Sequence, residues 1–504
     1  MAFENTVWGR IALISTRHHG VALRFRGKEF SYDYLKDQVD KYASRLYNLG
    51  IRKDDVVCIA APNIPSSIFA MYAVNSIGAI NFIVHPLIPA KALEEDLKKT
   101  KAKLLLVLDQ RYSIYKGIKQ CPIYTISPKN ELSPIEDFFY PIAYASPSFY
   151  LQSGGTTGKN KIVVLNDRAV NYQGENVAWI LGDQYKYCKG SGMLGFLPMF
   201  HGFGLAMGVH APLTNYATSD LMATYNEKEI GKLIKARKLR YLIVVPYLAK
   251  RMLKGKTLND PSVSNLTHAF IGADKTNPTV FTEFDSIMEK NNSKCRLLEG
   301  YGLTETVTVV VVNRIFDRKP GSVGKPFPDV KLKVIDENGN TLGTNQNGQI
   351  CISAPCLALG YLNDKEATDK TFVTDENGIR WVLTGDEGYI DEDGFLFIKG
   401  RIKDMFKIAG FNIFPADIED MTNKIEGVEN CAAVYIDNPN HPYVHLFIKS
   451  DSKNIDTSEL VKRVRKNLSD ELIKYAVPEK ITVIDNLPLT NVGKIDKKKL
   501  IELD

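Results

Sequence analysis

The chain has 504 residues, 44% of them apolar, and its 64 basic and 58 acidic residues give a formal net charge of +6. So much apolar sequence can bury a large core, which excludes an intrinsically disordered protein, and the length predicts roughly two to four domains. The charges are interspersed apart from short basic clusters. Nucleic-acid binding usually needs a concentrated basic patch with aromatic residues between the charges, so no nucleic-acid partner is expected.

The cysteines and the apolar segments indicate the compartment. The seven cysteines include no CxxC pair, which favours neither a zinc site nor a disulfide framework, and we expect a reduced, cytoplasmic protein. The N-terminal sequence MAFENTVWGR lacks the apolar core of a signal peptide. The longest apolar segment, Phe69–Ala90, is interrupted by polar residues and prolines. It therefore predicts a buried helix followed by a strand, and no transmembrane segment.

The first part of the chain predicts alternating helices and strands. Tyr32–Leu49 carries apolar residues at helical spacing between Ser31 and Gly50, which are suitable cap residues. Leu104–Leu108 is entirely apolar, as expected for a strand buried on both faces. A further strand is expected at Val56–Ala60 and a further helix at Ile68–Ile77. This alternation predicts helices layered on a parallel sheet.

The stretch Tyr150–Leu165, YLQSGGTTGKNKIVVL, begins and ends in apolar runs. Its adjacent glycines let backbone N–H groups converge on an oxyanion, while the threonine hydroxyls add donors and the lysines add positive charge. The pattern predicts a phosphate-binding loop, and the alternative is an ordinary hairpin with a basic edge. It is not a Walker loop, because its glycine spacing is one residue short and Asn160 replaces the magnesium-binding hydroxyl residue. The candidate phosphate-binding residues are Ser153, Gly154, Gly155, Thr156, Thr157, Gly158 and Lys161.

Several later strands also end in loops with candidate functional residues. Strands are expected at Met193–Met199, Leu242–Val245, Ala269–Ile271 and Cys295–Leu298, with an amphipathic helix at Glu227–Lys238. The first strand leads into PMFHGFGLAMG, the third into Gly272-Ala273-Asp274 and the last into GYGLTET. Ligands of α/β sheets collect beyond the carboxyl ends of the strands. These loops therefore predict one ligand-binding crevice.

The pattern of expected secondary structure changes twice towards the C-terminus. From Val330, short strands separated by turns such as ENGN and DEDG predict a compact β subdomain. After Arg401 a separate α+β unit is expected, and we place the boundary between Ile402 and Lys403, which gives domains 1–402 and 403–504. The expected elements of this unit are helices at Asp417–Ile425 and Ser458–Ile473 and strands at Cys431–Ile436, Val444–Ile448 and Lys480–Ile484.

Four further motifs follow the glycine-rich loop in order along the chain. They are GYGLTET (Gly300–Thr306), LTGDEGYIDEDGFLFIKGR (Leu383–Arg401), KDMFKIAGFNIFPADIED (Lys403–Asp420) and LPLTNVGKIDKKKL (Leu487–Leu500). Together with the loop they resemble the adenylate-forming (AMP-binding) superfamily of acyl-CoA synthetases, peptide-synthetase adenylation domains and luciferases. The greatest likeness is to bacterial medium-chain and long-chain acyl-CoA synthetases. The resemblance implies an α/β fold, with a large N-terminal domain of layered α/β subdomains plus a β subdomain and a small mobile C-terminal α+β domain.

The resemblance also implies the cofactors ATP, Mg2+ and coenzyme A, and it assigns roles to residues of the large domain. Glu305 matches a magnesium contact, which suits a hard cation that prefers carboxylate oxygen. Outside such a motif, Glu305 would be an ordinary surface acid and Tyr301 an ordinary core residue. The implied nucleotide-site residues are the loop residues 153–158 and Lys161 for phosphate, Thr304 for phosphate, Gly300, Tyr301 and Gly302 for adenine or the acyl group, Asp386 for ribose, Arg401 for ribose or phosphate, and Gly272, Ala273 and Asp274 for adenine.

Four residues carry the remaining chemistry that the resemblance implies. His201 is either a structural histidine or a residue that lines the acyl pocket near the carboxylate. Lys494, in NVGKID, matches the lysine that bridges the carboxylate and the α-phosphate. A key lysine on the small domain implies that this domain closes onto the large one. In the family the small domain then rotates about the position of Lys403, and Gly410 leaves room for the pantetheine thiol.

The leading functional prediction is an acid–thiol ligase that converts a carboxylic acid and MgATP into an acyl-AMP and then passes the acyl group to CoA. The alternatives are the loading of a carrier-protein phosphopantetheine, a non-catalytic nucleotide-binding or acyl-binding protein, and a light-emitting oxygenase. Apolar segments beside the motifs favour a hydrophobic, fatty acid over a polar amino acid. The identity of the acid, the pathway and the oligomeric state stay open at this point.

Overall fold

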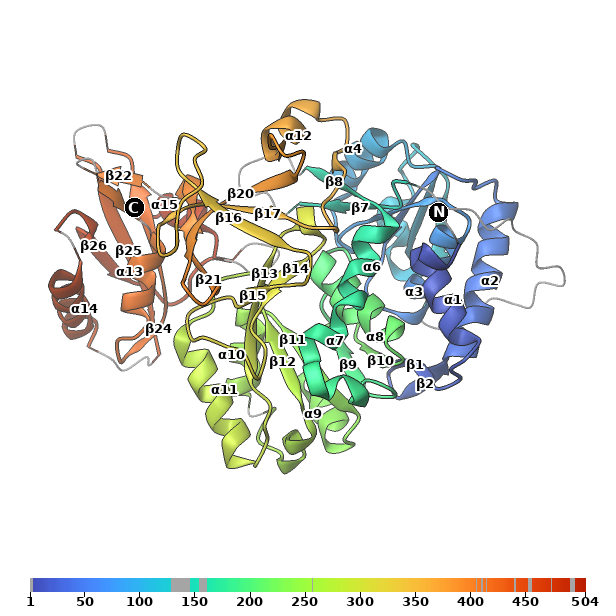
Figure 1. The fold of residues 1–504 in the computed structure, drawn as a ribbon, viewed down its shortest axis with the longest axis horizontal. Helices are drawn as coiled ribbons and strands as arrows, with labels where there is room; N and C mark the ends of the chain where they lie inside the picture. The colour runs from blue at the N-terminus through green and yellow to red at the C-terminus, as the bar shows by residue number, and fades with distance from the viewer. Residues whose placement is uncertain are drawn as a thin grey trace.

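The computed structural model of the chain describes residues 3–127, 146–153, 161–255, 257–404, 406–408, 411–413, 415–438, 441–451, 456–472, 474–489 and 495–504. A large body of layered sheets and helices stands beside a small C-terminal body, which is drawn in orange-red in Figure 1. This arrangement confirms the expected fold class. None of the described helices is long and apolar enough to cross a membrane.

The first sheet of the large body carries the glycine-rich segment. Its described strands follow the order β18-β8-β7-β4-β3-β5-β6. Strands β7, β4, β3, β5 and β6 are parallel, while β8 and β18 run antiparallel to their neighbours. The strands are β3 (Val56–Ala60), β4 (Ile80–Ile83), β5 (Leu104–Leu108), β6 (Ile123–Ile126), β7 (Phe149–Gln152), β8 (Ile162–Leu165) and β18 (Gly360–Tyr361), and their helices are α2 (Tyr32–Asn48), α3 (Pro65–Ser76), α4 (Ala90–Thr100) and α5 (Tyr112–Tyr115).

The second sheet has the described order β15-β14-β13-β12-β11-β9-β10-β1-β2. Its central strands β10, β9, β11, β12 and β13 are parallel. The strands are β1 (Val21–Phe25), β2 (Lys28–Ser31), β9 (Gly192–Gly195), β10 (Thr218–Leu221), β11 (Leu239–Val244), β12 (His268–Ile271), β13 (Leu297–Gly302), β14 (Val309–Val312) and β15 (Lys325–Pro326). The accompanying helices are α1 (Val7–Ser15), α6 (Asp167–Glu175), α7 (Val177–Leu181), the π-helix η4 (Phe203–His210), α8 (Ala211–Thr214), α9 (Glu227–Lys235), α10 (Pro246–Lys254) and α11 (Pro278–Lys290).

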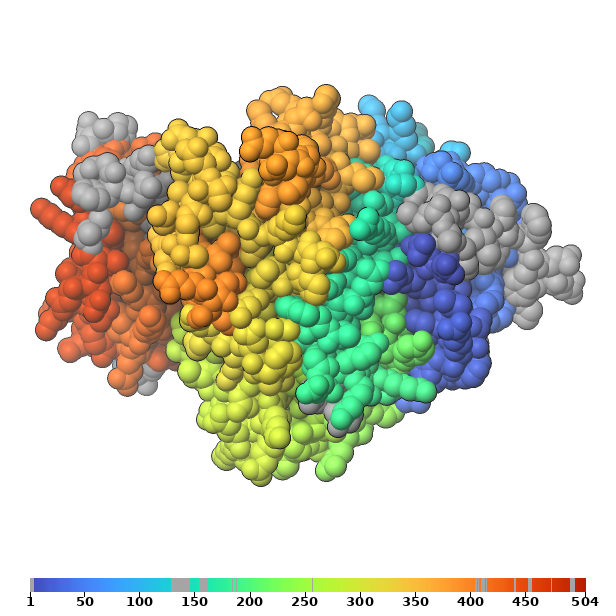
Figure 2. All heavy atoms as spheres, viewed as in Figure 1, coloured from blue at the N-terminus to red at the C-terminus, as the bar shows by residue number. Residues whose placement is uncertain are grey.

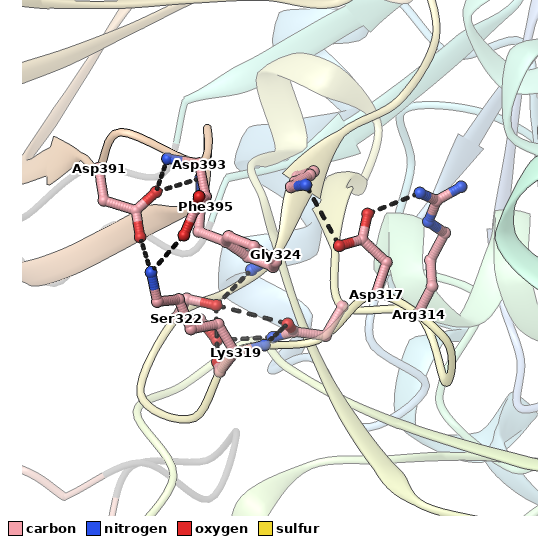
Figure 3. Close-up of polar contacts among 10 residues, drawn as sticks. Arg314, Asp317, Lys319, Ser322, Gly324, Asp391, Asp393 and Phe395 are labelled. Atoms are coloured by element: carbon pink, nitrogen blue, oxygen red, sulfur yellow. Dashed lines mark hydrogen bonds and ion pairs between the residues drawn. The ribbon is translucent and has the colours of Figure 1, made fainter. Parts of the chain in front are cut away.

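A smaller antiparallel sheet forms the expected β subdomain. It contains β16 (Lys331–Ile335), β17 (Gly348–Ser353), β19 (Phe372–Thr374), β20 (Arg380–Ile390) and β21 (Leu396–Arg401), with α12 (Lys365–Thr371) beside it. Figure 3 shows how the loop before β15 is fastened to the turn between β20 and β21. There, Lys319 Nζ lies 2.6 Å from Asp391 Oδ2 and 2.9 Å from Asp393 Oδ2. These ion pairs tie the β20–β21 hairpin to the second sheet.

The small body is the expected α+β unit. A hairpin of β22 (Phe406–Ile408) and β23 (Phe411–Ile413) precedes a sheet with the described order β24-β25-β26. Its own apolar core includes Ile418, Leu446 and Leu460, all fully buried. The remaining elements are β24 (Val428–Ile436), β25 (Tyr443–Ser450), β26 (Lys480–Val483), α13 (Pro415–Thr422), α14 (Thr457–Glu471) and α15 (Lys497–Ile501).

Several expected strands differ in length from the observed ones, and two of these differences affect the candidate crevice. The strand expected at Met193–Met199 ends at Gly195, because the buried Asn63 side chain binds the backbone of residues 195, 197 and 199 in place of a neighbouring strand. The strand expected at Cys295–Leu298 continues to Gly302, since Gly300–Gly302 pairs with β14. The motif GYGLTET therefore begins inside a strand.

Candidate active site

The glycine-rich segment connects two antiparallel strands. Gln152 pairs with Ile162, and the Ser153 N–H donates to Lys161 O at 2.9 Å, which closes the base of the connection between β7 and β8. Residues 154–160 lie outside the described residues. The phosphate contacts of Gly154, Gly155, Thr156, Thr157 and Gly158 therefore stay predictions, while Ser153 and Lys161 are placed at the two ends of the loop.

Lys161 and Glu305 are joined by a tyrosine that the sequence reasoning missed. The Tyr361 hydroxyl donates to Glu305 Oε1 at 2.6 Å, and Lys161 Nζ lies 4.4 Å from the centre of the Tyr361 ring. Tyr361 comes from the two-residue strand β18, which pairs with β8 directly after the glycine-rich loop. Burial and the Glu305 charge raise the pKa of Tyr361, so the hydroxyl stays a donor. Tyr361 thus fixes the Glu305 carboxylate beside the base of the loop.

The donor set at Glu305 fits a magnesium ion that also binds nucleotide phosphate. Among the described residues, no group of three or more histidine, cysteine, aspartate or glutamate side chains could hold a metal by itself. Mg2+ is commonly bound in proteins by one or two carboxylates together with substrate phosphates and water. A single oriented carboxylate beside a lysine and a glycine-rich loop would suit such a site. Glu305 is the residue that would hold the ion.

A second cluster joins Tyr301, Asp386 and Arg401. Asp386 is almost completely buried, at 5% exposure. Its two carboxylate oxygens accept from the Tyr301 hydroxyl at 2.5 Å and from Arg401 Nε at 2.8 Å. Asp386 and Arg401 face each other across β20 and β21, which explains why residues fifteen positions apart in the chain form an ion pair. Burial and the Asp386 charge raise the pKa of Tyr301 well above its ordinary value.

The turn that carries Thr304 and Glu305 is held by two close backbone approaches. A Cβ at Gly302 would lie 1.8 Å from Thr308 O, and a Cβ at Gly202 would lie 1.6 Å from Val307 O. Only glycine permits such approaches. Val307 itself has a φ of 65°, which is strained for a β-branched residue. Because Gly202 follows His201 directly, the segment FHGFG contacts the two residues that directly follow the motif GYGLTET.

The segment that leads to His201 is positioned by Asn63, a second residue that the sequence reasoning missed. The Asn63 amide donates to Gly195 O at 3.0 Å and Leu197 O at 2.8 Å, and its oxygen accepts from Met199 N at 2.9 Å. Asn63 follows β3 of the first sheet, whereas these partners lie at the end of β9 and directly after it in the second. A buried asparagine with all three bonds satisfied therefore fixes the two sheets relative to each other. The sequence feature that could have drawn attention to Asn63 is its place next to prolines directly after an expected strand.

The residues expected along adenine lie at the end of β12. A Cβ at Gly272 would come 2.9 Å from Gly300 O, so this position borders β13. Ala273 has a left-handed φ of 72°, and the exposed Asp274 accepts from the Lys275 backbone N–H at 2.9 Å. No described contact joins Asp274 to the Tyr361–Glu305 pair or to the Tyr301–Asp386–Arg401 cluster. On the neighbouring strand β13, burial raises the pKa of Glu299 to about 7.

The small body meets the large one through lysine–carboxylate contacts. Lys275 Nζ lies 2.6 Å from Asp420 Oδ2, and Lys254 Nζ lies 2.9 Å from Glu429 Oε1. Helix α13 and the start of β24 therefore face the large body, while β22 lies on the side of the small body away from α10 and α11 (Figure 1). Figure 2 shows the two bodies in contact along the yellow and yellow-green segments. Lys403 is exposed directly after β21, and Gly410 and Lys494 lie outside the described residues.

Comparisons with known proteins agree with this architecture. The family model for AMP-binding enzymes matches residues 12–362, and the model for their C-terminal domain matches residues 417–494. 4-Coumarate–CoA ligase 3 of Arabidopsis thaliana is 29% identical over 503 residues, which cover 94% of this chain and 86% of that protein. The long-chain-fatty-acid–CoA ligase of Escherichia coli O157:H7 is 27% identical over 521 residues, covering 94% and 90%. The ATP-bound structure of MatB from Rhodopseudomonas palustris has the same fold, with a TM-score of 0.88 at 22% identity and coverage of 99% and 98%.

The chain therefore belongs to the AMP-binding enzyme family, as the five sequence motifs predicted. The expected enzyme class, AMP-forming acid–thiol ligases, is confirmed with it. The relatives named above act on chemically different acids, one aromatic and one aliphatic.

Proposed function

We propose that the protein adenylates a hydrophobic carboxylic acid with MgATP and transfers the acyl group to CoA. The observation that carries the proposal is the connection of Lys161 to Glu305 through Tyr361, because it combines a cation and an oriented carboxylate at the base of a glycine-rich loop. A carboxylate oxygen of the acid attacks the α-phosphorus, the bond from that phosphorus to the bridging oxygen breaks, and pyrophosphate leaves. The thiol sulfur then attacks the acyl carbon, AMP leaves with the former carboxylate oxygen, and the thiol proton passes to water.

The residues of this chain would act by positioning and by charge stabilisation, which are the main requirements of phosphoryl transfer. Lys161 and the loop would hold the phosphates, and Glu305 would hold Mg2+, which neutralises phosphate charge when bound. Asp386, fixed by Tyr301 and Arg401, would accept from the ribose hydroxyls. Lys494 would approach the carboxylate and the α-phosphate from the small domain.

The division into domains 1–402 and 403–504, with rotation about Lys403, belongs to the same proposal. The β22–β23 hairpin flanks Gly410 and lies away from α10 and α11 in Figure 1. A rotation that brings this hairpin to the crevice has to break the ion pairs Lys275–Asp420 and Lys254–Glu429. We assign the orientation in the structure to the adenylation step for this reason. The seven free thiols agree with a reducing, cytoplasmic setting.

A cavity beneath the helix that follows His201 supports a hydrophobic acid. It has a volume of about 30 Å³, and its mostly apolar lining includes Val177, Cys188, Met207, Ala211, Tyr241 and Phe270 together with the polar Asn215. Met207 and Ala211 continue the chain from His201 and Gly202, and Phe270 lies two residues before Gly272. Its walls are thus continuous with two segments of the candidate site. Burial of each methylene contributes about 0.8 kcal/mol, so efficiency should rise with acyl chain length until the cavity is filled.

The test is pyrophosphate release, followed by CoA thioester formation, across saturated acids from acetate to dodecanoate, with 4-coumarate and amino acids for comparison. Ala211→Leu should shift the preferred chain to shorter acids, and Met207→Ala should shift it to longer ones. Val209→Ile, on the same helix but outside the cavity lining, is the matched control and should leave the preference unchanged. A flat response to chain length, or a preference for an amino acid, contradicts the hydrophobic acid. Acyl-AMP formation without a CoA thioester, but with charging of a carrier protein, favours the carrier-loading alternative.

A further inference from the structure

His85 lies at the carboxyl end of a strand that borders the glycine-rich loop. Strand β4 runs parallel to β7, with Ile83 opposite Leu151. Continuing this pairing by two residues puts His85 beside Ser153, where the loop begins. His85 is half-buried, so part of the residue is exposed to solvent.

The His85 ring also reaches the segment that contains His201. Its centre lies 4.8 Å from the centre of the Phe200 ring, which in turn lies 4.4 Å from the centre of the His201 ring. His85 belongs to the first sheet, whereas Phe200 and His201 follow a strand of the second. These tilted ring contacts therefore join the two sheets between the loop expected to bind phosphate and the residue expected near the acyl carboxylate.

A backbone hydrogen bond determines which nitrogen of His85 carries the proton. The Leu87 N–H donates to His85 Nδ1 at 2.9 Å, so Nδ1 is the acceptor and the neutral ring has its proton on Nε2. Burial and the nearby Arg111 charge lower the pKa of His85, which favours the neutral ring near pH 7. In this tautomer Nε2 is a hydrogen-bond donor. It cannot accept a proton as a general base.

We propose that His85 is an oxyanion-binding residue of the active site, whose Nε2–H donates to an anionic oxygen of a substrate in the crevice. The oxygen belongs either to the carboxylate of the acid or to a phosphate of the nucleotide, since His85 lies between the positions expected for both. This assignment rests on the proposed function for the identity of the substrates. That His85 offers an Nε2–H donor follows from the Leu87 N–H bond to Nδ1, and that the donor lies near the crevice follows from the position of β4 beside β7.

The rival explanation is structural: His85 only caps the turn at Leu87 and packs on Phe200. Asparagine separates the two explanations, because its side-chain oxygen also accepts from the N–H two residues ahead but does not reach as far as Nε2. His85→Asn therefore keeps the turn bond and loses the donor. His85→Phe keeps the ring contact with Phe200 and loses both the donor and the turn bond. His19→Asn, at an exposed histidine paired with Asp33, is the matched control.

The experiment measures calorimetric binding of MgATP and of the acid, the rate of ATP–pyrophosphate exchange, and the melting temperature. Hydrogen bonds to charged groups contribute enough for an expected loss of roughly 10- to 100-fold in affinity or in kcat/KM for both His85 variants. His85→Asn should keep the wild-type melting temperature. If only the acid binds more weakly, the oxygen that accepts from His85 belongs to the carboxylate. If only MgATP binds more weakly, that oxygen belongs to a phosphate.

Two outcomes overturn the proposal for His85. One is His85→Asn with wild-type binding of both ligands, which leaves only the structural role. The other is a loss in His85→Phe but not in His85→Asn, which means that the turn bond matters and the donor does not. A wild-type protein that binds MgATP but shows no exchange with any acid refutes the proposed function instead, and the binding comparison still decides the role of His85. A wild-type protein that binds neither ligand refutes both.

Discussion

Replacement of Tyr361 by phenylalanine tests the geometry of the candidate magnesium site directly. The change removes the hydroxyl that donates to Glu305 Oε1 at 2.6 Å but keeps the ring beneath Lys161 Nζ. A hydrogen bond to a charged group contributes about 1.5–3 kcal/mol, and 1.4 kcal/mol corresponds to a factor of ten. We therefore expect kcat/KM for MgATP to fall roughly 10- to 100-fold, because Glu305 is no longer held in one orientation.

The assay is ATP–pyrophosphate exchange at a series of Mg2+ concentrations. If Tyr361 acts by orienting the magnesium ligand, the loss is largest when Mg2+ is limiting and shrinks as Mg2+ approaches saturation. The matched control is Tyr443→Phe, which also removes a tyrosine–carboxylate bond, from Tyr443 to Asp504 at 2.7 Å, but on the small domain. This control should exchange like the wild type. Unchanged exchange in Tyr361→Phe, or an equal loss at every Mg2+ concentration, would refute the role of Tyr361 in orienting a magnesium ligand at Glu305.

Three further predictions concern other parts of the site. The pKa of Glu299 is raised to about 7 by burial, so the folded protein keeps a proton that the unfolded chain releases, and stability should fall as pH rises from about 4.5 to 7. Glu299→Gln should remove this dependence of stability on pH and stabilise the protein at pH 8 by about 1–2 kcal/mol after screening. The measurement is the free energy of unfolding from denaturation at a series of pH values, and an unchanged pH dependence contradicts the prediction. Lys494→Ala should fold normally and lose adenylation by on the order of 100- to 1000-fold, with a much smaller loss from preformed acyl-AMP and CoA; equal losses in both half-reactions argue against two orientations of the small domain. Gly410→Leu should keep pyrophosphate exchange while thioester formation slows and acyl-AMP accumulates, whereas equal damage to both assigns Gly410 to the fold.

The spacing of apolar residues was enough to predict most helices and strands, and the five motifs were enough to predict the family. The strand Leu104–Leu108 was predicted with its observed bounds, and the helix expected at Tyr32–Leu49 is observed at Tyr32–Asn48. These elements follow from short-range periodicity, which a single sequence contains in full. The candidate residues Glu305, Asp386 and Arg401 were likewise selected from the sequence, because each lies in a continuous stretch of characteristic residues, and their roles stay predictions.

The partners of those residues were decided by tertiary structure alone. Tyr361 lies 56 positions from Glu305 on a strand of two residues, which is too short to show periodicity. Asn63 binds residues 132 to 136 positions ahead, and His85 meets Phe200 across two different sheets. A single sequence is enough to show which chemical groups are present and on which elements they lie. Only the packing of the two sheets decided which groups meet, because contacts between distant segments depend on how whole layers pack and leave no local pattern in the chain.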